Sequence, residues 1–247
     1  MRECAVAGSQ QVPDSMLGNF ANRIAYKIRR KLSPKKIRLK GIWLNTDEKE
    51  VPKGIRKQLL EKRYEHQELI LVREAILPTD KVLEAGAGIG FIGIACAQIC
   101  GTKNLLSYEP NPAMKPLIEA NYALNGFTPN LRNKVLAPVS GELEFFFSEG
   151  VLSSSLINRN EGGATKVAAD AISDVIETFA PTALVIDVEG AEIDLMRACD
   201  LKGVGKIIIE MHPHVVGAEK IEDLKSYLAG CGFTEKRRLG KTIFYAR

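Results

Sequence analysis

The chain has 247 residues, of which 45% are hydrophobic and 26% charged, and its formal net charge is +4. This composition is ordinary for a globular protein and excludes a chain that is mainly disordered. The length suits one large α/β domain or two small ones, with enough residues to bury a substantial core.

The positive charge is concentrated near the N-terminus. Residues 23–40 contain nine Lys and Arg residues and no Asp or Glu, so the rest of the chain carries 25 bases against 30 acids. A mildly acidic body with one basic segment differs from a protein that coats nucleic acid with its whole surface. Three interpretations of the segment stay open: a solvated helix and strand, docking on an anionic lipid or polysaccharide, and a nucleic-acid contact.

The cysteines and the apolar stretches indicate in which compartment we expect the protein. Five Cys residues without metal-finger spacing are interpreted as reduced thiols of a cytoplasmic protein. The N-terminal residues lack the apolar region of a signal peptide. The uncharged stretch 85–97 is too short to span a bilayer and contains four Gly residues, so we expect a buried turn and helix there. We therefore expect no transmembrane segment.

The N-terminal part predicts three elements. A short basic helix is expected over 20–33, because Pro34 stops it. Residues 36–44 alternate basic and apolar side chains and predict a strand pattern that is broken by a Gly. Residues 54–77 predict one helix, because apolar residues recur there at helical spacing.

Strands and helices alternate over the rest of the chain. Strands are expected at 81–85, 104–108, 134–138, 182–187, 206–211, 232–237 and 241–246, and helices at 90–100, 112–125, 170–178, 191–199 and 218–229. This alternation predicts an α/β fold with a mostly parallel sheet and helices on both faces. The last two strands should form a hairpin, so that one edge strand is antiparallel. Residues 143–147 and 165–168 are expected to pair around a polar loop, 148–163.

A glycine-rich turn follows the first of these strands. Gly86, Gly88 and Gly90 permit a tight turn and a close approach of the backbone to a ligand, and the next helix offers free N–H groups. The spacing G-x-G-x-G differs from the dinucleotide pattern because Phe91 occupies the third Gly position. The turn contains no Lys or Arg, which agrees with a ligand that has no phosphate.

Two acids accompany this turn. Glu84 lies two residues before the first Gly, where a carboxylate could hold an ammonium group. Glu109 ends the next strand, at a place where an acid can accept both hydroxyls of a ribose, and Pro110 could cover one face of a base. S-adenosylmethionine (SAM) carries a ribose and a charged amine but no phosphate. The three features together predict a SAM site.

Seven short motifs complete this pattern: YE at 64–65, VLEAGAGIGF at 82–91, YEPNP at 108–112, SSSL at 153–156, AISDVI at 171–176, IDVEGAE at 186–192 and IIIEMH at 207–212. In this order and spacing, the chain resembles class I, SAM-dependent methyltransferases of the FkbM family. The resemblance implies a Rossmann-like class I methyltransferase fold, whose seven-stranded, mostly parallel sheet has an antiparallel last strand. It implies SAM as cofactor and methylation of hydroxyl oxygens. It also suggests a basic extension, 1–53, followed by a methyltransferase domain, 54–247.

The carboxyl ends of two predicted strands carry the candidate catalytic groups. Asp187 and Glu189 follow one strand, and Glu210 and His212 follow the next. Because ligands of open α/β sheets bind outside these ends, the four groups should face one crevice. His212 is the candidate base, and Asp187 or Glu189 would orient it or hold the acceptor hydroxyl. The alternative for His212 is a capping or supporting role. Family members commonly have Lys at the position of Val185.

Other side chains suggest further roles. An Asp/Glu/His cluster also suits Mg²⁺, but no dedicated acid pair is present, so we expect no metal. His66 and His214 are expected at the surface. Tyr64 and Glu65 would close over the methionine end of the cofactor or form a helix-surface pair. The loop 148–163 is the expected place of acceptor binding.

These observations predict a cytoplasmic SAM-dependent O-methyltransferase that acts on a hydroxyl of a small molecule or glycan. The first alternative is a nucleic-acid methyltransferase that docks through the basic segment. Such an enzyme would be expected to carry an N-P-P-Y-like box or a nucleophilic Cys where this chain has Asp187-Val-Glu-Gly. An NAD-dependent oxidoreductase is disfavoured by the glycine spacing and by Glu84. A catalytically idle SAM-binding module is the third alternative.

Overall fold

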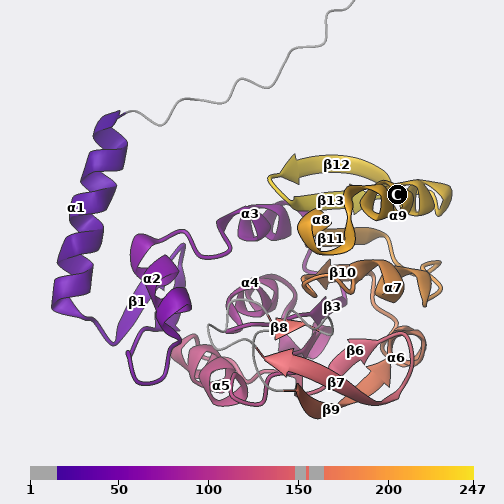
Figure 1. The fold of residues 1–247 in the computed structure, drawn as a ribbon, viewed down its shortest axis with the longest axis horizontal. Coiled ribbons are helices and arrows are strands. Elements are labelled where there is room, and N and C mark those ends of the chain that lie inside the picture. The colour runs from indigo at the N-terminus through magenta and orange to yellow at the C-terminus, as the bar shows by residue number, and fades with distance from the viewer. Residues whose placement is uncertain (1–15, 148–153, 156–163) are drawn as a thin grey trace, which may run out of the picture.

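The computed structural model describes residues 16–147, 154–155 and 164–247, and its centre is a seven-stranded sheet (Figure 1). The strand order is β12-β13-β11-β10-β3-β4-β5. The strands are β3 (Val82–Ala85), β4 (Leu105–Tyr108), β5 (Leu131–Arg132), β10 (Ala183–Ile186), β11 (Lys206–Glu210), β12 (Thr234–Leu239) and β13 (Thr242–Ala246). Five neighbouring strands, from β11 to β5, pair in parallel, whereas β13 is antiparallel to both of its neighbours.

The predicted sheet is therefore confirmed, with two corrections. The strand predicted at 134–138 lies in a second sheet, and β5 takes its place beside β4. The second correction concerns the end of the chain. The last strand of the chain is antiparallel, as expected, but it does not lie at the edge. It inserts between β11 and β12, so the edge strand β12 runs in the same direction as β11. The inserted strand buries Thr242, Ile243, Phe244 and Tyr245, whereas most of β12 is exposed. The more apolar of the two strands thus takes the inner position.

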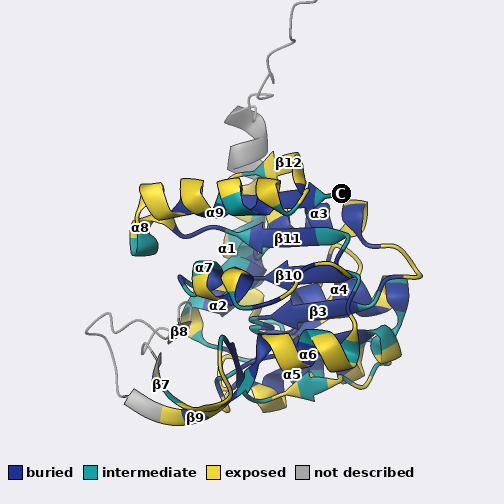
Figure 2. Ribbon diagram, turned by 90° about the vertical axis from the view of Figure 1, so that its right-hand side faces the viewer, coloured by how far each residue is buried: buried dark blue, intermediate teal, exposed yellow. Residues whose placement is uncertain are grey.

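Helices cover both faces of the sheet, whose central strands are almost wholly buried (Figure 2). One face packs against α3 (His66–Ala75), α4 (Phe91–Cys100) and α5 (Lys115–Leu124). The other face packs against α6 (Ile172–Phe179), α7 (Glu192–Arg197) and α9 (Ala218–Gly230), and α8 (Pro213–Val216) lies next to α9. A short 3-10 turn, η1 (Thr102–Asn104), precedes β4. No helix in the described part of the chain is long and apolar enough to cross a bilayer.

A second sheet of four strands is separate from the first. Its order is β6-β9-β7-β8, with β6 (Val135–Ala137), β7 (Gly141–Phe147), β8 (Ser154–Ser155) and β9 (Ala164–Ala171). The predicted pairing of 143–147 with 165–168 is confirmed, because β7 and β9 form an antiparallel ladder. Most of the predicted acceptor loop, 148–163, lies outside the described residues, so its role stays a prediction.

The N-terminal elements are α1 (Met16–Leu32) and a hairpin of β1 (Lys36–Leu39) and β2 (Ile42–Asn45). The alternation predicted for 36–44 is confirmed, and the Gly forms the hairpin turn. The hairpin packs on α5, where Asn45 N–H donates to Oδ1 of Asn121 over 2.7 Å. Helix α1 lies at the side of the molecule, next to α2 (Lys53–Glu61) (Figure 1). The division of the chain after residue 53 remains a prediction.

The single helix predicted over 54–77 is wrong. Two helices, α2 and α3, replace it, and Lys62 and Glu65 between them have φ of 60° and 42°. The apolar spacing fits a helix on each side of this break. The break buries the ring of Tyr64, whose centroid lies 6.0 Å from that of Phe91. It thereby places Tyr64 and Glu65 at the cavity described next.

Candidate active site

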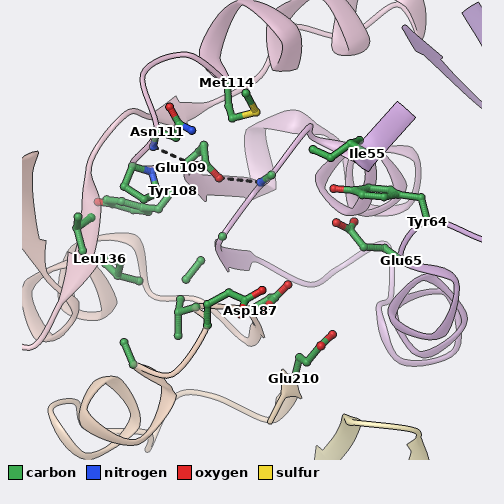
Figure 3. A pocket seen from close by; sticks show the side chains of 18 of the residues that line it. Ile55, Tyr64, Glu65, Tyr108, Glu109, Asn111, Met114, Leu136, Asp187 and Glu210 are labelled. Carbon is green, nitrogen blue, oxygen red and sulfur yellow. Dashed lines mark hydrogen bonds between the residues drawn. The ribbon is translucent and has the colours of Figure 1, made fainter. Parts of the chain in front are cut away.

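A cavity of about 400 Å³ lies at the carboxyl ends of β3, β4, β10 and β11 (Figure 3). Its wall comes from the turns after these strands and from the link between α2 and α3. The volume lies within the range of small-molecule sites. This position, outside the carboxyl ends of parallel strands, is where open α/β sheets bind ligands.

The glycine turn forms one wall of the cavity. Gly86 has a φ of 92°, and a Cβ there would overlap the carbonyl oxygen of Asp187. Gly88 also has a positive φ, and a Cβ there would lie 3.2 Å from the hydroxyl of Tyr64. Gly86 and Gly88 line the cavity. Gly90, at the start of α4, instead packs against Tyr122 of α5. It therefore positions the turn and does not line the cavity.

Glu109 lies on the same side of the cavity, next to the glycine turn. Its Oε2 accepts a 2.8 Å hydrogen bond from Gly88 N–H, and its Oε1 accepts a 2.9 Å bond from Asn111 N–H (Figure 3). Burial raises the pKa of Glu109 to about 7, although both backbone hydrogen bonds lower it. Each carboxylate oxygen keeps a lone pair that can accept a hydroxyl. Pro110, Met114 and Leu136 add apolar surface beside it.

An acidic cluster forms the far end of the cavity. Asp187, Glu189 and Glu210 line it, and His212 lies behind them with a side chain that is only 1% exposed. Nε2 of His212 is 3.7 Å from Oδ1 of Asp187, 3.6 Å from Oε2 of Glu189 and 3.5 Å from Oε1 of Glu210. The four predicted groups thus meet, as the strand-end argument requires.

Two cations offset part of the negative charge of this cluster. Lys241, from the turn between β12 and β13, lies with Nζ 2.6 Å from Oε1 of Glu210. Burial disfavours a charged His212, but its hydrogen bonds with Glu192 and Glu210 and the charges of Asp187 and Glu189 raise its pKa to about 10. Hydrogen bonds from His212 and Lys241 lower the pKa of Glu210 to about 2, against the effect of burial. His212 is therefore an imidazolium near neutral pH.

Asp187 differs from its neighbours. Burial and the negative charge of Glu210 raise its pKa to about 7, although His212 opposes this shift. Its Oδ1 is buried and has no hydrogen-bond partner among the described residues. A carboxyl that titrates near pH 7 at the wall of a cavity has the pKa expected of a general base.

The comparison with known families is decisive for the class of protein. The family model described as "Methyltransferase FkbM domain" matches residues 84–235, which is more than half of the chain. The chain belongs to the FkbM methyltransferase family. This family is SAM-dependent, and SAM is therefore the cofactor of this FkbM-family chain. An oxidoreductase is excluded by this match.

Several solved structures are similar to this chain over most of its length. The methyltransferase FkbM from Methylobacillus flagellatus KT is 13% identical, with 92% of this chain and 59% of that chain covered and a TM-score of 0.49. TYW2 from P. horikoshii, in complex with MeSAdo, is 13% identical, with 94% and 83% covered and a TM-score of 0.47. The ribosomal protein L11 methylase from Lactobacillus delbrueckii subsp. bulgaricus is 18% identical, with 72% and 74% covered and a TM-score of 0.42. At these identities the likeness concerns the fold alone. A search among curated proteins finds no significant match.

The residues of this FkbM-family chain fit SAM. The unused lone pairs of Glu109 suit ribose hydroxyls, and the apolar surface of Pro110 and Met114 suits an adenine. Glu65 and Asp187 line the opposite side, where their carboxylates suit a cationic methionine end (Figure 3). Burial raises the pKa of Glu65 well above its ordinary value, against the hydrogen bond from Tyr64, so a bound cation would favour its charged form.

Glu84 lies elsewhere than its predicted role requires. It does not line the cavity and is 1% exposed, on the sheet face that packs against α4. A Cβ on Gly93 of that helix would lie 2.6 Å from Oε2 of Glu84. The reason is the alternation of strand side chains, which turns Glu84 into the core and leaves the next turn to face the cavity. The geometry therefore disfavours direct contact with the ammonium group.

The histidines also differ from expectation in part. His214 is exposed, as predicted, but His66 is half-buried, and its Nδ1 has no hydrogen-bond partner among the described residues. His212 neither lines the cavity nor offers a neutral ring, so its surroundings favour the supporting role over that of a base.

Two contributors were not singled out from the sequence. Glu192 is fully buried beneath His212, and Lys241 reaches Glu210 from the far end of the chain. Glu192 is the last residue of the IDVEGAE motif, which was the available signal. Lys241 stands between a Gly and a Thr in a polar turn, and nothing in that pattern distinguishes it from a solvated Lys.

A metal can also be considered at the acidic cluster. One ligand atom each of Asp187, Glu210 and His212 lies within 4.8 Å of the others. Lys241 already contacts Glu210, and a metal there would have to displace the proton that the surrounding carboxylates favour on His212. In this protonation state, the positive charge at the cluster comes from side chains.

Proposed function

We propose that this FkbM-family protein transfers the methyl group of SAM to a hydroxyl oxygen of a small molecule or glycan. The observation that carries the proposal is the Asp187 carboxyl, which lies at the cavity wall with a pKa near 7. A hydroxyl must lose its proton as its oxygen is methylated, so it needs such a group.

The cofactor end of the cavity positions the donor. We assign Glu109 to the two ribose hydroxyls, Pro110 to one face of the adenine, and the backbone of Gly86 and Gly88 to the closest approach. SAM supplies an electrophilic methyl group, whose bond to sulfur breaks as the bond to the acceptor oxygen forms. Holding the two reactants in line contributes about 7–11 kcal/mol in ideal cases.

The acidic end handles the proton. The carboxylate of Asp187 accepts the proton of the acceptor hydroxyl, while the His212 imidazolium, whose Nε2 lies 3.7 Å from the buried Oδ1, holds Asp187 in place and favours its ionised form. Glu189 lines the same wall and can accept a hydrogen bond from a further hydroxyl of the acceptor. Such a pair of carboxylates suits a polyol better than an anionic substrate.

The transfer that we propose uses no metal. Lys241 and His212 provide the cations beside Glu210 and Asp187, which is the place that a divalent ion would otherwise occupy. Methyl transfer that persists after dialysis against EDTA supports this part of the proposal. Loss of transfer that added Mg²⁺ or Mn²⁺ restores would overturn it.

The cofactor site is tested by calorimetric titration with S-adenosylhomocysteine. Glu109→Gln should weaken binding at least about tenfold, because it replaces a hydroxyl acceptor that is charged above pH 7. Glu84→Gln is the matched control, since both acids are buried with a pKa of about 7 but only Glu109 lines the cavity. Equal loss in both variants, or in neither, would refute the assignment.

The acceptor class is tested with SAM that is labelled in its methyl group. We expect incorporation of the label into sugars or polyols. Asp187→Asn should lower this incorporation about 10²–10⁴-fold, while its affinity for S-adenosylhomocysteine stays unchanged. Incorporation into RNA or into amines alone would overturn the O-methyl assignment. It would instead favour the alternative in which the basic segment 23–40 delivers a nucleic acid.

A further inference from the structure

Helix α1 carries a row of exposed aliphatic side chains. Ile24, Ile28 and Leu32 are spaced four residues apart and are 43%, 54% and 73% exposed. Residues four apart lie on one side of a helix, so the three form a continuous stripe. They are three of the seven exposed large hydrophobic side chains in the described part of the chain. Such a concentration on one helix differs from the scattered exposure that is normal for a soluble surface.

The body of the protein does not cover this stripe, because α1 docks through another side. Ala25, Tyr26 and Arg29 are half-buried, and Tyr26 packs against the main core. Nε of Arg29 donates a 2.5 Å hydrogen bond to the carbonyl oxygen of Leu60 on α2. At about 100° per residue, the stripe lies roughly a quarter-turn from this docked side. The rotation of α1 about its axis is therefore set by contacts that leave the stripe outside.

Basic side chains flank the stripe. Arg23, Lys27, Arg30 and Lys31 are exposed on the same helix, and residues 23–40 contain no acid. Around the helix, Lys31 and Lys27 lie next to the stripe on the side away from the body. The helix thus has three sides, of which one is docked, one is apolar and one is positively charged.

The hairpin that follows α1 repeats this combination. Lys36 and Arg38 point outward from β1, and Arg38 pairs with Trp43 of β2. Trp43 is 38% exposed, and Nζ of Lys36 lies 5.5 Å from the centre of its ring. A Trp with neighbouring cations is typical of a membrane–water interface, where the ring contacts acyl chains and the charges contact headgroups.

We propose that α1 and this hairpin form a docking surface for an anionic lipid membrane. An amphipathic helix with aliphatic side chains beside Lys and Arg lies in the plane of such a membrane, with its apolar side at the headgroup–acyl boundary. The basic side chains then contact the negative surface. This inference does not depend on the proposed acceptor, since it concerns where the protein is held.

Two other partners fit the same surface less well. An RNA would neutralise the bases but leave Ile24, Ile28 and Leu32 in water. A second copy of the chain would cover the stripe but would bring two segments of nine bases together without a single acid. Of these three partners, only an anionic lipid surface satisfies the apolar and the charged side at once.

Cosedimentation of the full chain with vesicles tests the proposal. The protein should bind vesicles of phosphatidylcholine and phosphatidylserine, should not bind phosphatidylcholine alone, and should dissociate as salt is raised. A variant with Ile24→Ser, Ile28→Ser and Leu32→Ser should lose at least about tenfold in affinity. Lys27→Glu with Lys31→Glu should lose a similar factor through charge.

Val139→Ser with Leu77→Ser is the matched control, because both side chains are exposed and lie outside α1 and the hairpin. Every variant should keep the circular dichroism spectrum of the native protein and its affinity for S-adenosylhomocysteine. Equal binding to neutral and anionic vesicles, or binding that the stripe variant retains, would overturn the proposal. The proposal would also be overturned if the native protein bound no vesicles. A stripe variant that then lost a dimer or RNA binding would assign the surface to that partner instead.

Discussion

Oε1 of Glu192 lies 3.3 Å from Nδ1 of His212 and accepts a 2.8 Å hydrogen bond from the backbone N–H of the same residue. Oε2 accepts a 2.7 Å bond from Gly190 N–H. A fully buried carboxylate therefore joins the turn after β10 to the end of β11 and directs Nε2 of His212 toward Asp187. This one side chain thereby links two of the segments that carry the acidic cluster.

Replacement of Glu192 should affect both stability and the titration of His212. Glu192→Ala leaves two buried N–H groups and an imidazolium without their acceptor, so we expect a loss of about 3–5 kcal/mol in the free energy of unfolding. Glu192→Gln should lose less but should lower the His212 pKa, which NMR titration measures. Glu222→Ala, an exposed acid paired with Lys225, should change stability by less than about 0.5 kcal/mol. An unchanged His212 pKa in Glu192→Gln would contradict this account.

The pH dependence of methyl transfer should follow Asp187. Its carboxyl must be ionised to accept a proton, so kcat should rise with pH around its pKa of about 7 and then level off. The imidazolium of His212, with a pKa of about 10, stays charged over this range. Initial rates at saturating SAM from about pH 5 to pH 9 measure the profile. The residual activity of Asp187→Asn should lack this step, and a step that persists there would assign it to another group.

Glu84 should make stability depend on pH. Burial raises its pKa from 4.5 to about 7, so the native state binds this proton more tightly than the unfolded chain does. The resulting stabilisation is full below about pH 4.5 and is lost as pH rises through about 7. Glu84→Gln cannot ionise and should gain up to about 3 kcal/mol over the native protein above pH 7. Urea unfolding on both sides of this window measures the difference, and a gain that is equal at both pH values would show that ionisation is not its cause.

Gly86 should tolerate no side chain. In Gly86→Ala the Cβ would overlap the carbonyl oxygen of Asp187, in addition to the strain of a φ of 92°. Gly101→Ala is the matched control, because Gly101 has a φ of 79° and no atom within 4 Å of the Cβ position. We expect a loss of about 1–2 kcal/mol for Gly101→Ala and at least about 2 kcal/mol more for Gly86→Ala. Equal losses by urea unfolding would mean that the turn and β10 can separate.

Local patterns in the chain predicted most of the sheet and the place of the site. The alternation of strands and helices restricts the topology to a parallel sheet with two covered faces, and strand ends must then meet at one edge. For this reason Gly86, Glu109, Asp187 and Glu210 could be brought to one cavity before any contact was known. The glycine spacing, together with Glu109, also indicated a cofactor without phosphate.

Features that depend on contacts between distant segments could not be predicted from the sequence. The break between α2 and α3 has no Gly or Pro at its start, and burial of Tyr64 against Phe91 accompanies it. The motif marks only how far Glu84 lies from Gly86 along the chain. It does not indicate on which side of the strand the Glu84 side chain lies. The state of His212 depends on four carboxylates, one of which, Glu192, belongs to a helix.

The sequence by itself determined the order of elements, the family and the strand ends that carry the chemistry, because these are properties of short stretches with a regular period or motif. Only the tertiary structure decided that His212 is a buried cation, that the pKa of Asp187 lies near 7, and that Lys241 contacts Glu210. The physical reason is that a pKa is set by burial and by the charges within a few ångströms. Here those charges come from three segments, which lie at residues 187–192, 210–212 and 241.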